Sequence, residues 1–157
     1  MNEIELFFNT IQTGVLKNVE LQLKRNPELV NAKDARGFTP LILAAYFDKI
    51  PIVKLLLEYK APVNATDSLG NTALIGVSFK GNTELMACLI ENGANINAIN
   101  NNGTSSLIFA AMYNKQDSVA FLLQFKPDIT IKDNTGKTAL YYAKEKGFTN
   151  IVRLLEN

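Results

Sequence analysis

Short apolar runs recur along the chain at one constant spacing. The runs IVKLLL, LMACLI, SVAFLL and IVRLLE begin at residues 52, 85, 118 and 151, so that consecutive runs lie 33 residues apart. A glycine keeps the same period, at Gly37, Gly70, Gly103 and Gly136. So does a leucine, at Leu41, Leu74, Leu107 and Leu140. A fixed period of this length indicates a stack of similar supersecondary units that share one continuous core.

Each unit carries the signals of two helices and a turn-rich loop. A hydroxyl residue two positions after each repeat glycine predicts a helix N-cap, because its oxygen accepts a free backbone N–H. These residues are Thr39, Thr72, Ser105 and Thr138. The helix is expected to end where Asp, Gly or Asn tolerates the left-handed conformation, at Asp48, Gly81, Asn114 and Gly147. The apolar run then forms a second helix, and polar stretches such as VNATDSLGN predict hairpin-like loops.

These residues resemble a known family. The stretch GFTPLILAAYFDKIPIVKLLLEYKAPVNATDSL is similar to an ankyrin repeat, and NGANINA at 92–98 matches the segment that closes one. The resemblance implies an all-α fold, an ankyrin-repeat solenoid of stacked helix-turn-helix units with projecting β-turn or hairpin loops. It covers nearly the whole chain as a single domain, 1–157. We expect a divergent N-terminal repeat at 4–36, full repeats at 37–69, 70–102 and 103–135, and a C-terminal capping repeat at 136–157.

Departures from the family pattern lead to further expectations. The family usually has a histidine after TPL, and here its place is taken by Ile42, Ile75, Ile108 and Tyr141. We expect the three isoleucines to be buried between repeats. The glycine that usually ends the second helix remains only as Gly93, so Lys60 and Lys126, which stand in its place elsewhere, are expected to adopt a positive φ. The polar last repeat, with Lys144 where a small residue would pack, predicts a cap and a complete chain.

The composition excludes several classes of partner and of catalytic site. The 157 residues include 16 basic and 15 acidic ones without a run of either sign, so we expect no nucleic-acid partner and no membrane binding. Histidine is absent, which excludes Ser-His and Cys-His couples and imidazole metal ligands. The single cysteine, Cys88, is expected to be buried and inert and fits a cytoplasmic location. We expect no cofactor, no metal site and no catalytic residue.

The resemblance also implies a binding surface. In the family, the residues after the paired alanines and those flanking each repeat glycine lie on the concave face. Here these positions are rich in Tyr, Phe, Met and Arg, which are enriched at interfaces. The implied partner-binding residues are Arg36, Phe38, Tyr46, Phe47, Leu69, Asn71, Phe79, Lys80, Asn102, Thr104, Met112, Tyr113, Lys137 and Lys146. For any one of them the alternative is packing against a neighbouring loop without a function.

The function expected from this reading is a non-catalytic protein-protein interaction module. A monomeric chain would hold a protein or peptide in its concave groove and act as an adaptor, an inhibitor or an antitoxin-like partner. One alternative is a small-molecule sensor or a histidine-free enzyme that uses carboxylates, tyrosines or lysines in the same groove. Self-association through the groove is another. A deep pocket with convergent polar groups would favour the sensor or the enzyme.

Overall fold

Five consecutive helix pairs make up the chain. The computed structural model describes all residues from 1 to 157. The helices are α1 (Glu3–Thr13), α2 (Leu16–Arg25), α3 (Pro40–Tyr46), α4 (Ile50–Glu58), α5 (Ala73–Lys80), α6 (Thr83–Glu91), α7 (Ser106–Met112), α8 (Gln116–Leu123), α9 (Ala139–Glu145) and α10 (Thr149–Glu156). A short 3-10 helix, Pro27–Asn31, follows α2.

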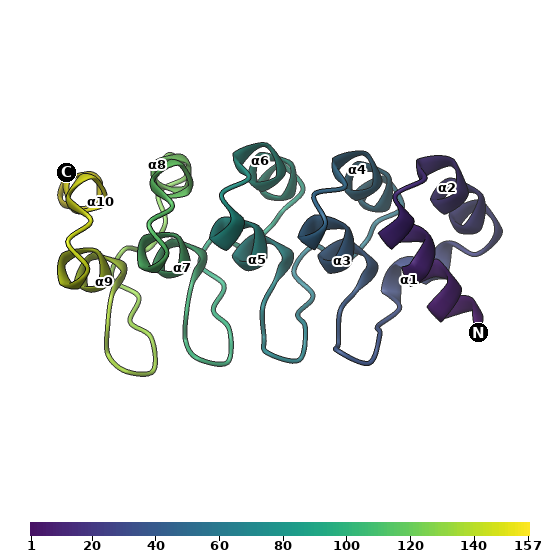
Figure 1. The fold of residues 1–157 in the computed structure, drawn as a ribbon, viewed down its shortest axis with the longest axis horizontal. Helices are drawn as coiled ribbons and strands as arrows, with labels where there is room; N and C mark the ends of the chain where they lie inside the picture. Colours follow the sequence, from purple (N-terminus) through teal and green to yellow (C-terminus); the bar gives the residue numbers. More distant parts are fainter.

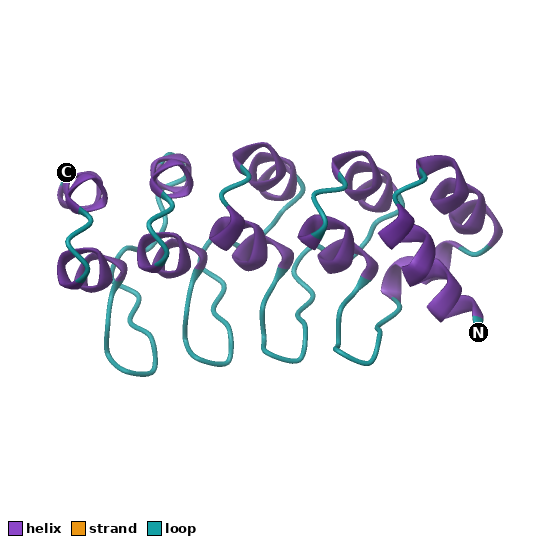
Figure 2. Cartoon of the chain, in the orientation of Figure 1, coloured by secondary structure: helices purple, strands orange, loops and turns teal.

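The pairs stack in a row and form two layers. Figure 1 shows the first helices α1, α3, α5, α7 and α9 in one layer, and the second helices α2, α4, α6, α8 and α10 in the other. The long loops all project on the side of the first helices (Figure 2). They form no sheet, and the one isolated bridge joins Ile99 and Ser105. The expected all-α solenoid is confirmed. None of its helices has the length and apolar character that a bilayer crossing requires.

The first helices of the four later pairs begin and end where the repeat pattern predicted. The side-chain oxygens of Thr39, Thr72, Ser105 and Thr138 each accept a hydrogen bond from the backbone N–H three residues later, at 3.1 to 3.2 Å. Left-handed residues follow these helices, with φ of 55° at Asp48, 83° at Gly81, 56° at Asn114 and 71° at Gly147. Both expectations are therefore confirmed, and the helices are short because each is closed at both ends.

Small and branched apolar side chains fill the space between neighbouring pairs. The paired alanines of α3 and α7 are at most 1% exposed. Ile42, Ile75 and Ile108 are 7%, 1% and 1% exposed, which confirms their predicted burial. Tyr141, at the same position in α9, is 47% exposed because no further pair covers it. An apolar contact thus replaces the usual histidine in the three inner pairs, whereas α9 has an open face.

Backbone hydrogen bonds join each loop to the next one. The N–H of Ser68 donates to the carbonyl of Arg36 at 3.3 Å, and the N–H of Asn101 donates to the carbonyl of Leu69 at 3.0 Å. The N–H of Asn134 donates to the carbonyl of Asn102 at 2.9 Å. These bonds hold the loops in register and link successive loops into one continuous surface.

The second helices of two pairs end on a strained lysine. Lys60 has a φ of 64° and Lys126 a φ of 51°, as predicted from the glycine that both replace, while Gly93 has a φ of 95°. A side chain in this conformation costs about 1 kcal/mol or more.

The last loop contains a buried carboxylate. Asp133 Oδ1 accepts hydrogen bonds from the N–H and the hydroxyl of Thr135 and from the N–H of Lys137, and Oδ2 accepts one from the Tyr142 hydroxyl. Burial alone raises the pKa of Asp133, but these hydrogen bonds outweigh it and lower the pKa to about 2. The bond to Asp133 correspondingly raises the pKa of Tyr142.

Replacing Lys60 by glycine should stabilise the protein. Lys60→Gly removes the left-handed strain and should raise the midpoint of thermal unfolding by roughly 2 to 4 °C. The matched reverse change, Gly93→Lys, should lower it by a similar amount. An unchanged or lower midpoint for Lys60→Gly, measured by circular dichroism, would contradict the account of the strain.

Restoring the family's histidine should destabilise this chain. Ile75→His places a polar ring in an apolar contact and should lower the free energy of unfolding by about 1 to 3 kcal/mol. Denaturation with urea measures the change. A histidine variant as stable as the parent would show that the interface still accommodates the polar contact.

The bond between Tyr142 and Asp133 should make stability depend on acid pH. The carboxylate has a lower pKa in the folded chain (about 2) than in the unfolded one (about 3.9), so its stabilising effect is complete above pH 4 and is lost towards pH 2. Tyr142→Phe should lower the free energy of unfolding by about 1 to 2 kcal/mol at pH 7, and this difference should shrink below pH 4. Tyr141→Phe is the control, because the Tyr141 side chain is exposed, and it should have no effect. A pH-independent difference would exclude the carboxylate as its source.

Candidate functional site

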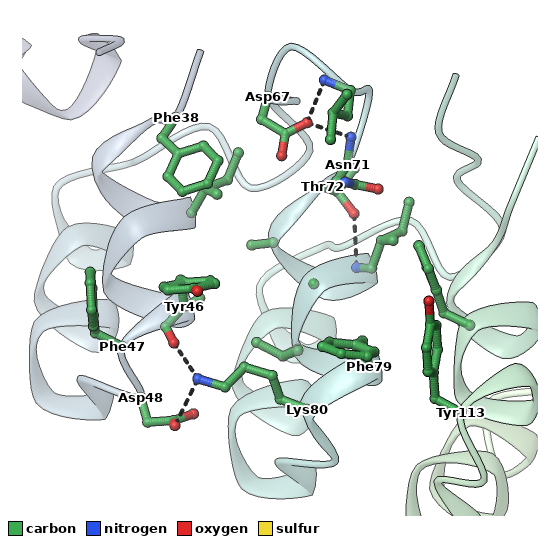
Figure 3. Close-up of a pocket in the computed structure, with 18 residues that line it drawn as sticks. Phe38, Tyr46, Phe47, Asp48, Asp67, Asn71, Thr72, Phe79, Lys80 and Tyr113 are labelled. Atoms are coloured by element: carbon green, nitrogen blue, oxygen red, sulfur yellow. Dashed lines mark hydrogen bonds and ion pairs between the residues drawn. The ribbon is translucent and has the colours of Figure 1, made fainter. Parts of the chain in front are cut away.

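A groove opens between the first helices α3 and α5 and extends to α7. Its volume is about 630 Å³, and 12 of its 18 lining residues are hydrophobic. Figure 3 shows side chains entering it from α3, from α5, from the end of α7 and from the loop that precedes α5. We call this feature the α3–α5 groove. Its large apolar walls are made by Phe38, Tyr46, Phe47, Leu69, Val77, Phe79, Phe109 and Tyr113.

Two clusters of aromatic rings face each other across the groove. In the first, Tyr46 lies between Phe38 and Phe47, with ring centroids 6.3 and 5.1 Å away. In the second, the Phe79 ring lies 4.6 Å edge-on from Tyr113 and 6.4 Å from Phe109. The rings of each cluster are thus in contact with one another, in tilted, edge-to-face or stacked arrangements.

The outward surfaces of these clusters are open. Tyr46 is 55% exposed, Phe79 43%, Tyr113 47% and Leu69 65%. Phe47 differs, because it is only partly exposed and packs against the core. Met112 is likewise half-buried against the core and does not line the groove. The exposed apolar surface thus comes from three consecutive repeats.

Lys80 crosses from α5 to the end of α3. Its Nζ donates to Asp48 Oδ2 at 3.0 Å and to the Tyr46 carbonyl, and it lies 5.2 Å from the centre of the Tyr46 ring. Burial raises the pKa of Asp48, but the hydrogen bonds from Lys80 and Asn82 outweigh it, and the net effect is a lowered pKa. The charge of Lys80 is therefore already compensated within the groove wall.

The other basic residues of the expected surface also lie over aromatic rings. The Arg36 guanidinium is 4.5 Å from the centre of Phe38 and pairs with Asp34 at 2.6 Å. Lys146 lies 5.8 Å from the Tyr113 ring and donates to the Met112 carbonyl at 3.0 Å. Lys137 lies 5.1 Å from the Tyr141 ring. These contacts fix the cations and leave no strongly basic patch on this side.

The expected binding residues separate into two groups. Eight line the α3–α5 groove: Phe38, Tyr46, Phe47, Leu69, Asn71, Phe79, Lys80 and Tyr113. Six do not: Arg36, Asn102, Thr104, Met112, Lys137 and Lys146. Thr104 needs a correction, because it is only 5% exposed, its N–H donates to Asn100 Oδ1 and its carbonyl accepts from the Asn100 N–H. It closes the turn and is not accessible to a partner.

The sequence reasoning missed Phe109 as a groove residue. It lies in the LIFAA run of α7, between the buried residues Ile108 and Ala110. A comparison of the repeats contains a signal, since the same position is Leu43 in α3 and Gly76 in α5. Phe109 is only partly buried and stacks on Tyr113 at 5.9 Å. It completes the wall that α7 contributes.

Most polar groups of the groove serve the local structure. Thr72 caps α5, and Asp67 Oδ1 accepts the N–H groups of Leu69 and Asn71 at 2.9 Å. No three His, Cys, Asp or Glu side chains cluster in a way that could hold a metal ion. Cys88 lies in α6, outside the groove, and burial raises the pKa of its thiol. The arrangement is suited to covering an apolar ligand surface.

Known proteins support the same fold. A family model described as ankyrin repeats, in three copies, matches residues 7–99 and 75–157. A human protein described as the DNA-binding protein RFXANK is 46% identical over 48 residues. That stretch is 31% of this chain but only 18% of the human protein, so the match spans less than a fifth of that relative. The repeat pattern, the stacked helix pairs and the family match agree, and the chain belongs to the ankyrin repeat family, whose members are in general non-catalytic protein-protein interaction modules.

Proposed function

We propose that this chain is a non-catalytic module that binds a protein or peptide in the α3–α5 groove, as an adaptor, an inhibitor or an antitoxin-like partner. The observation that carries the proposal is the row of half-exposed Tyr46, Phe79 and Tyr113 beside Leu69. Apolar side chains from three repeats on one surface form an extended patch, and such patches mark interaction sites on monomeric proteins.

The exposed aromatic area is large enough to drive binding. An aromatic side chain buries roughly 150 to 250 Å², and half of that area at about 25 cal/mol per Å² gives about 2 to 3 kcal/mol. Three such anchors supply about the free energy of a micromolar complex, about 8 kcal/mol, before ordering costs are subtracted. Because the rings already pack on each other, that ordering cost is small on this side.

Nucleic acid is not the partner that we propose. Counterion release drives nucleic-acid binding and needs several unpaired cations on one face. Here Arg36 and Lys80 are paired with carboxylates, and the chain has 16 basic against 15 acidic residues. The DNA-binding description belongs to a relative matched over 18% of its length. We also propose that the protein is monomeric and cytoplasmic. The single cysteine is consistent with the cytoplasmic location.

A small apolar molecule is a second candidate ligand. A volume of about 630 Å³ with a mostly hydrophobic lining lies within the range of small-molecule sites. Such sites also carry a few polar groups that orient the ligand. Here Lys80 and Thr72 are engaged by the fold, which leaves one oxygen of Asp67. The sensor is therefore the weaker hypothesis, and the enzyme weaker still.

Removing the aromatic anchors should abolish binding without unfolding the chain. Peptides selected on the purified protein from a random 12-residue phage library provide the probe, and fluorescence anisotropy measures their affinity. Changing Tyr46, Phe79 and Tyr113 together to serine should weaken binding by more than about 100-fold, since each exposed ring contributes at least about 2 kcal/mol. Far-UV circular dichroism should stay nearly unchanged, because all three rings are half-exposed.

The control changes the exposed Lys54 and Glu58 of α4 to serine, in the layer of second helices, and should alter neither property. A triple variant that unfolds would show that the rings are structural. A triple variant that stays folded and still binds the selected peptides would move the binding site to another face. If no small apolar compound displaces a selected peptide from the chain, that result would count against the sensor.

A further inference from the structure

The floor of the α3–α5 groove contains a glycine that the helix does not need. Gly76 lies in the middle of α5 with helical backbone, where glycine is about 1 kcal/mol less favourable than alanine. A Cβ placed on Gly76 would meet no atom within 4 Å outside its own turn of helix. Neither a positive φ nor close packing therefore explains the glycine. What it does is leave space in the groove.

The neighbouring repeats fill the same position. Leu43 in α3 is 1% exposed and part of the core, and Phe109 in α7 lies 6.4 Å from the Phe79 ring. Each of these two side chains thus fills the space beside its own helix that is left empty beside Gly76. Only at Gly76 does this gap stay open, and there the groove forms. A large apolar side chain of a ligand can occupy the place that Leu43 and Phe109 occupy elsewhere.

A carboxylate at the edge of this space has one unused oxygen. Asp67 Oδ1 accepts two backbone N–H groups of its turn, whereas no group of the protein donates to Oδ2. Asp67 is half-buried and lines the groove. In Figure 3 its second oxygen points away from the turn, towards the space between α3 and α5.

The equivalent residues in the other loops use both of their terminal atoms. Asp34 Oδ2 pairs with Arg36 at 2.6 Å, and Asp133 Oδ2 accepts from the Tyr142 hydroxyl. Asn100 Nδ2 donates to Asn71 Oδ1 at 2.9 Å. Asp67 is thus the exception among four equivalent turns, and it is the one that borders the groove.

The charges around the groove favour a cationic ligand group. Asp48, Asp67 and Lys80 are the charged residues that line it. Lys80 pairs with Asp48, and the guanidinium of Arg36 in the preceding loop is held by Asp34. The negative charge of Asp67 is left without a partner in a partly apolar setting, where a charge-assisted hydrogen bond is strong.

We propose that the α3–α5 groove recognises a protein segment that places a bulky aliphatic or aromatic side chain over Gly76 and pairs a neighbouring arginine or lysine with Asp67 Oδ2. This inference rests on the proposed peptide-binding function and specifies its ligand. Gly76 sets the size of the apolar residue, and Asp67 selects the basic one.

Peptides selected on the full chain from the random 12-residue library test both contacts. Enriched peptides should share a bulky apolar residue and an arginine or lysine at a constant spacing. Gly76→Leu should weaken their binding by at least about tenfold, the loss of one buried apolar side chain. It should also raise the midpoint of thermal unfolding by about 2 to 4 °C, which shows that the variant is folded. Gly76→Ala should give a similar rise with a smaller loss of affinity.

The charge contact has its own test. Asp67→Asn keeps the Oδ1 acceptor, which Asn100 also provides in the next loop. This change should lower the affinity for the selected peptides by roughly 10- to 100-fold. Changing the peptide's basic residue to glutamine should have the same effect, and the two changes combined should weaken binding no further than either alone. Asp133→Asn makes the matched change outside the groove and should leave binding unaltered.

The outcomes separate this inference from the function on which it rests. Peptides that lose binding to the triple serine variant, but bind Gly76→Leu and Asp67→Asn normally, would overturn the inference and leave the groove as the binding site. Enriched peptides without a basic residue would overturn the role of Asp67. If the chain dimerises in sedimentation experiments and Gly76→Leu makes it monomeric, the ligand of the groove would be a second copy of this chain and not a segment of another protein. A selection that enriches no peptide would contradict both proposals.

Discussion

The whole structure depends on the close approach of successive first helices in one register. Paired alanines in α3 and α7 allow this approach, because they are buried and occupy little space. In α5 the same two places hold Val77 and Ser78, and the Ser78 hydroxyl donates to the Leu74 carbonyl of its own helix at 2.7 Å. That bond satisfies the hydroxyl within the interface and makes a polar residue tolerable there. Backbone bonds between the loops then hold the same register at a distance from the helices.

The groove is a consequence of this stacking. The alanines make the contact between successive first helices. The aromatic residues at the helix ends lie outside this contact, and their rings therefore remain half-exposed. The left-handed residues at Asp48, Gly81 and Asn114 end each helix directly after these rings and turn the chain towards the second layer. Aromatic side chains from successive repeats therefore line one surface. Without Leu43 or Phe109 at the place of Gly76, that surface is hollow between α3 and α5.

Polar groups in this protein serve mainly to close turns and helix ends. Asp34, Asp67, Asn100 and Asp133 all accept backbone N–H groups in equivalent turns. Cations lie over rings and pair with neighbouring carboxylates or carbonyls. Such interactions define the shape of the loops and leave an apolar groove between them, with a single unused carboxylate oxygen at its edge. This division suits recognition of a complementary surface better than acid-base chemistry.

The sequence by itself determined the repeat, the helix boundaries and the strained ends. These features depend on residues that are close together along the chain: the capping hydroxyls, the helix-ending residues and the positive φ of Lys60. A 33-residue period therefore makes them recognisable in the sequence. The lining of the α3–α5 groove was predicted only in outline. Which residue of each pair at the helix end is exposed depends on contacts across repeats. Tyr46 is exposed and Phe47 is partly buried after α3, whereas Met112 is partly buried and Tyr113 is exposed at the end of α7.

Only the tertiary structure decided where a cavity lies and which polar atoms remain unused. Thr104 became inaccessible because its loop folds back on Asn100, and Phe109 joined the groove because it meets Phe79 of the preceding helix pair and Tyr113 at the end of its own helix. The space over Gly76 and the second oxygen of Asp67 both depend on which atoms come close between α3 and α5. Such distances arise from the stacking of whole repeats, and a local pattern along the chain does not encode them.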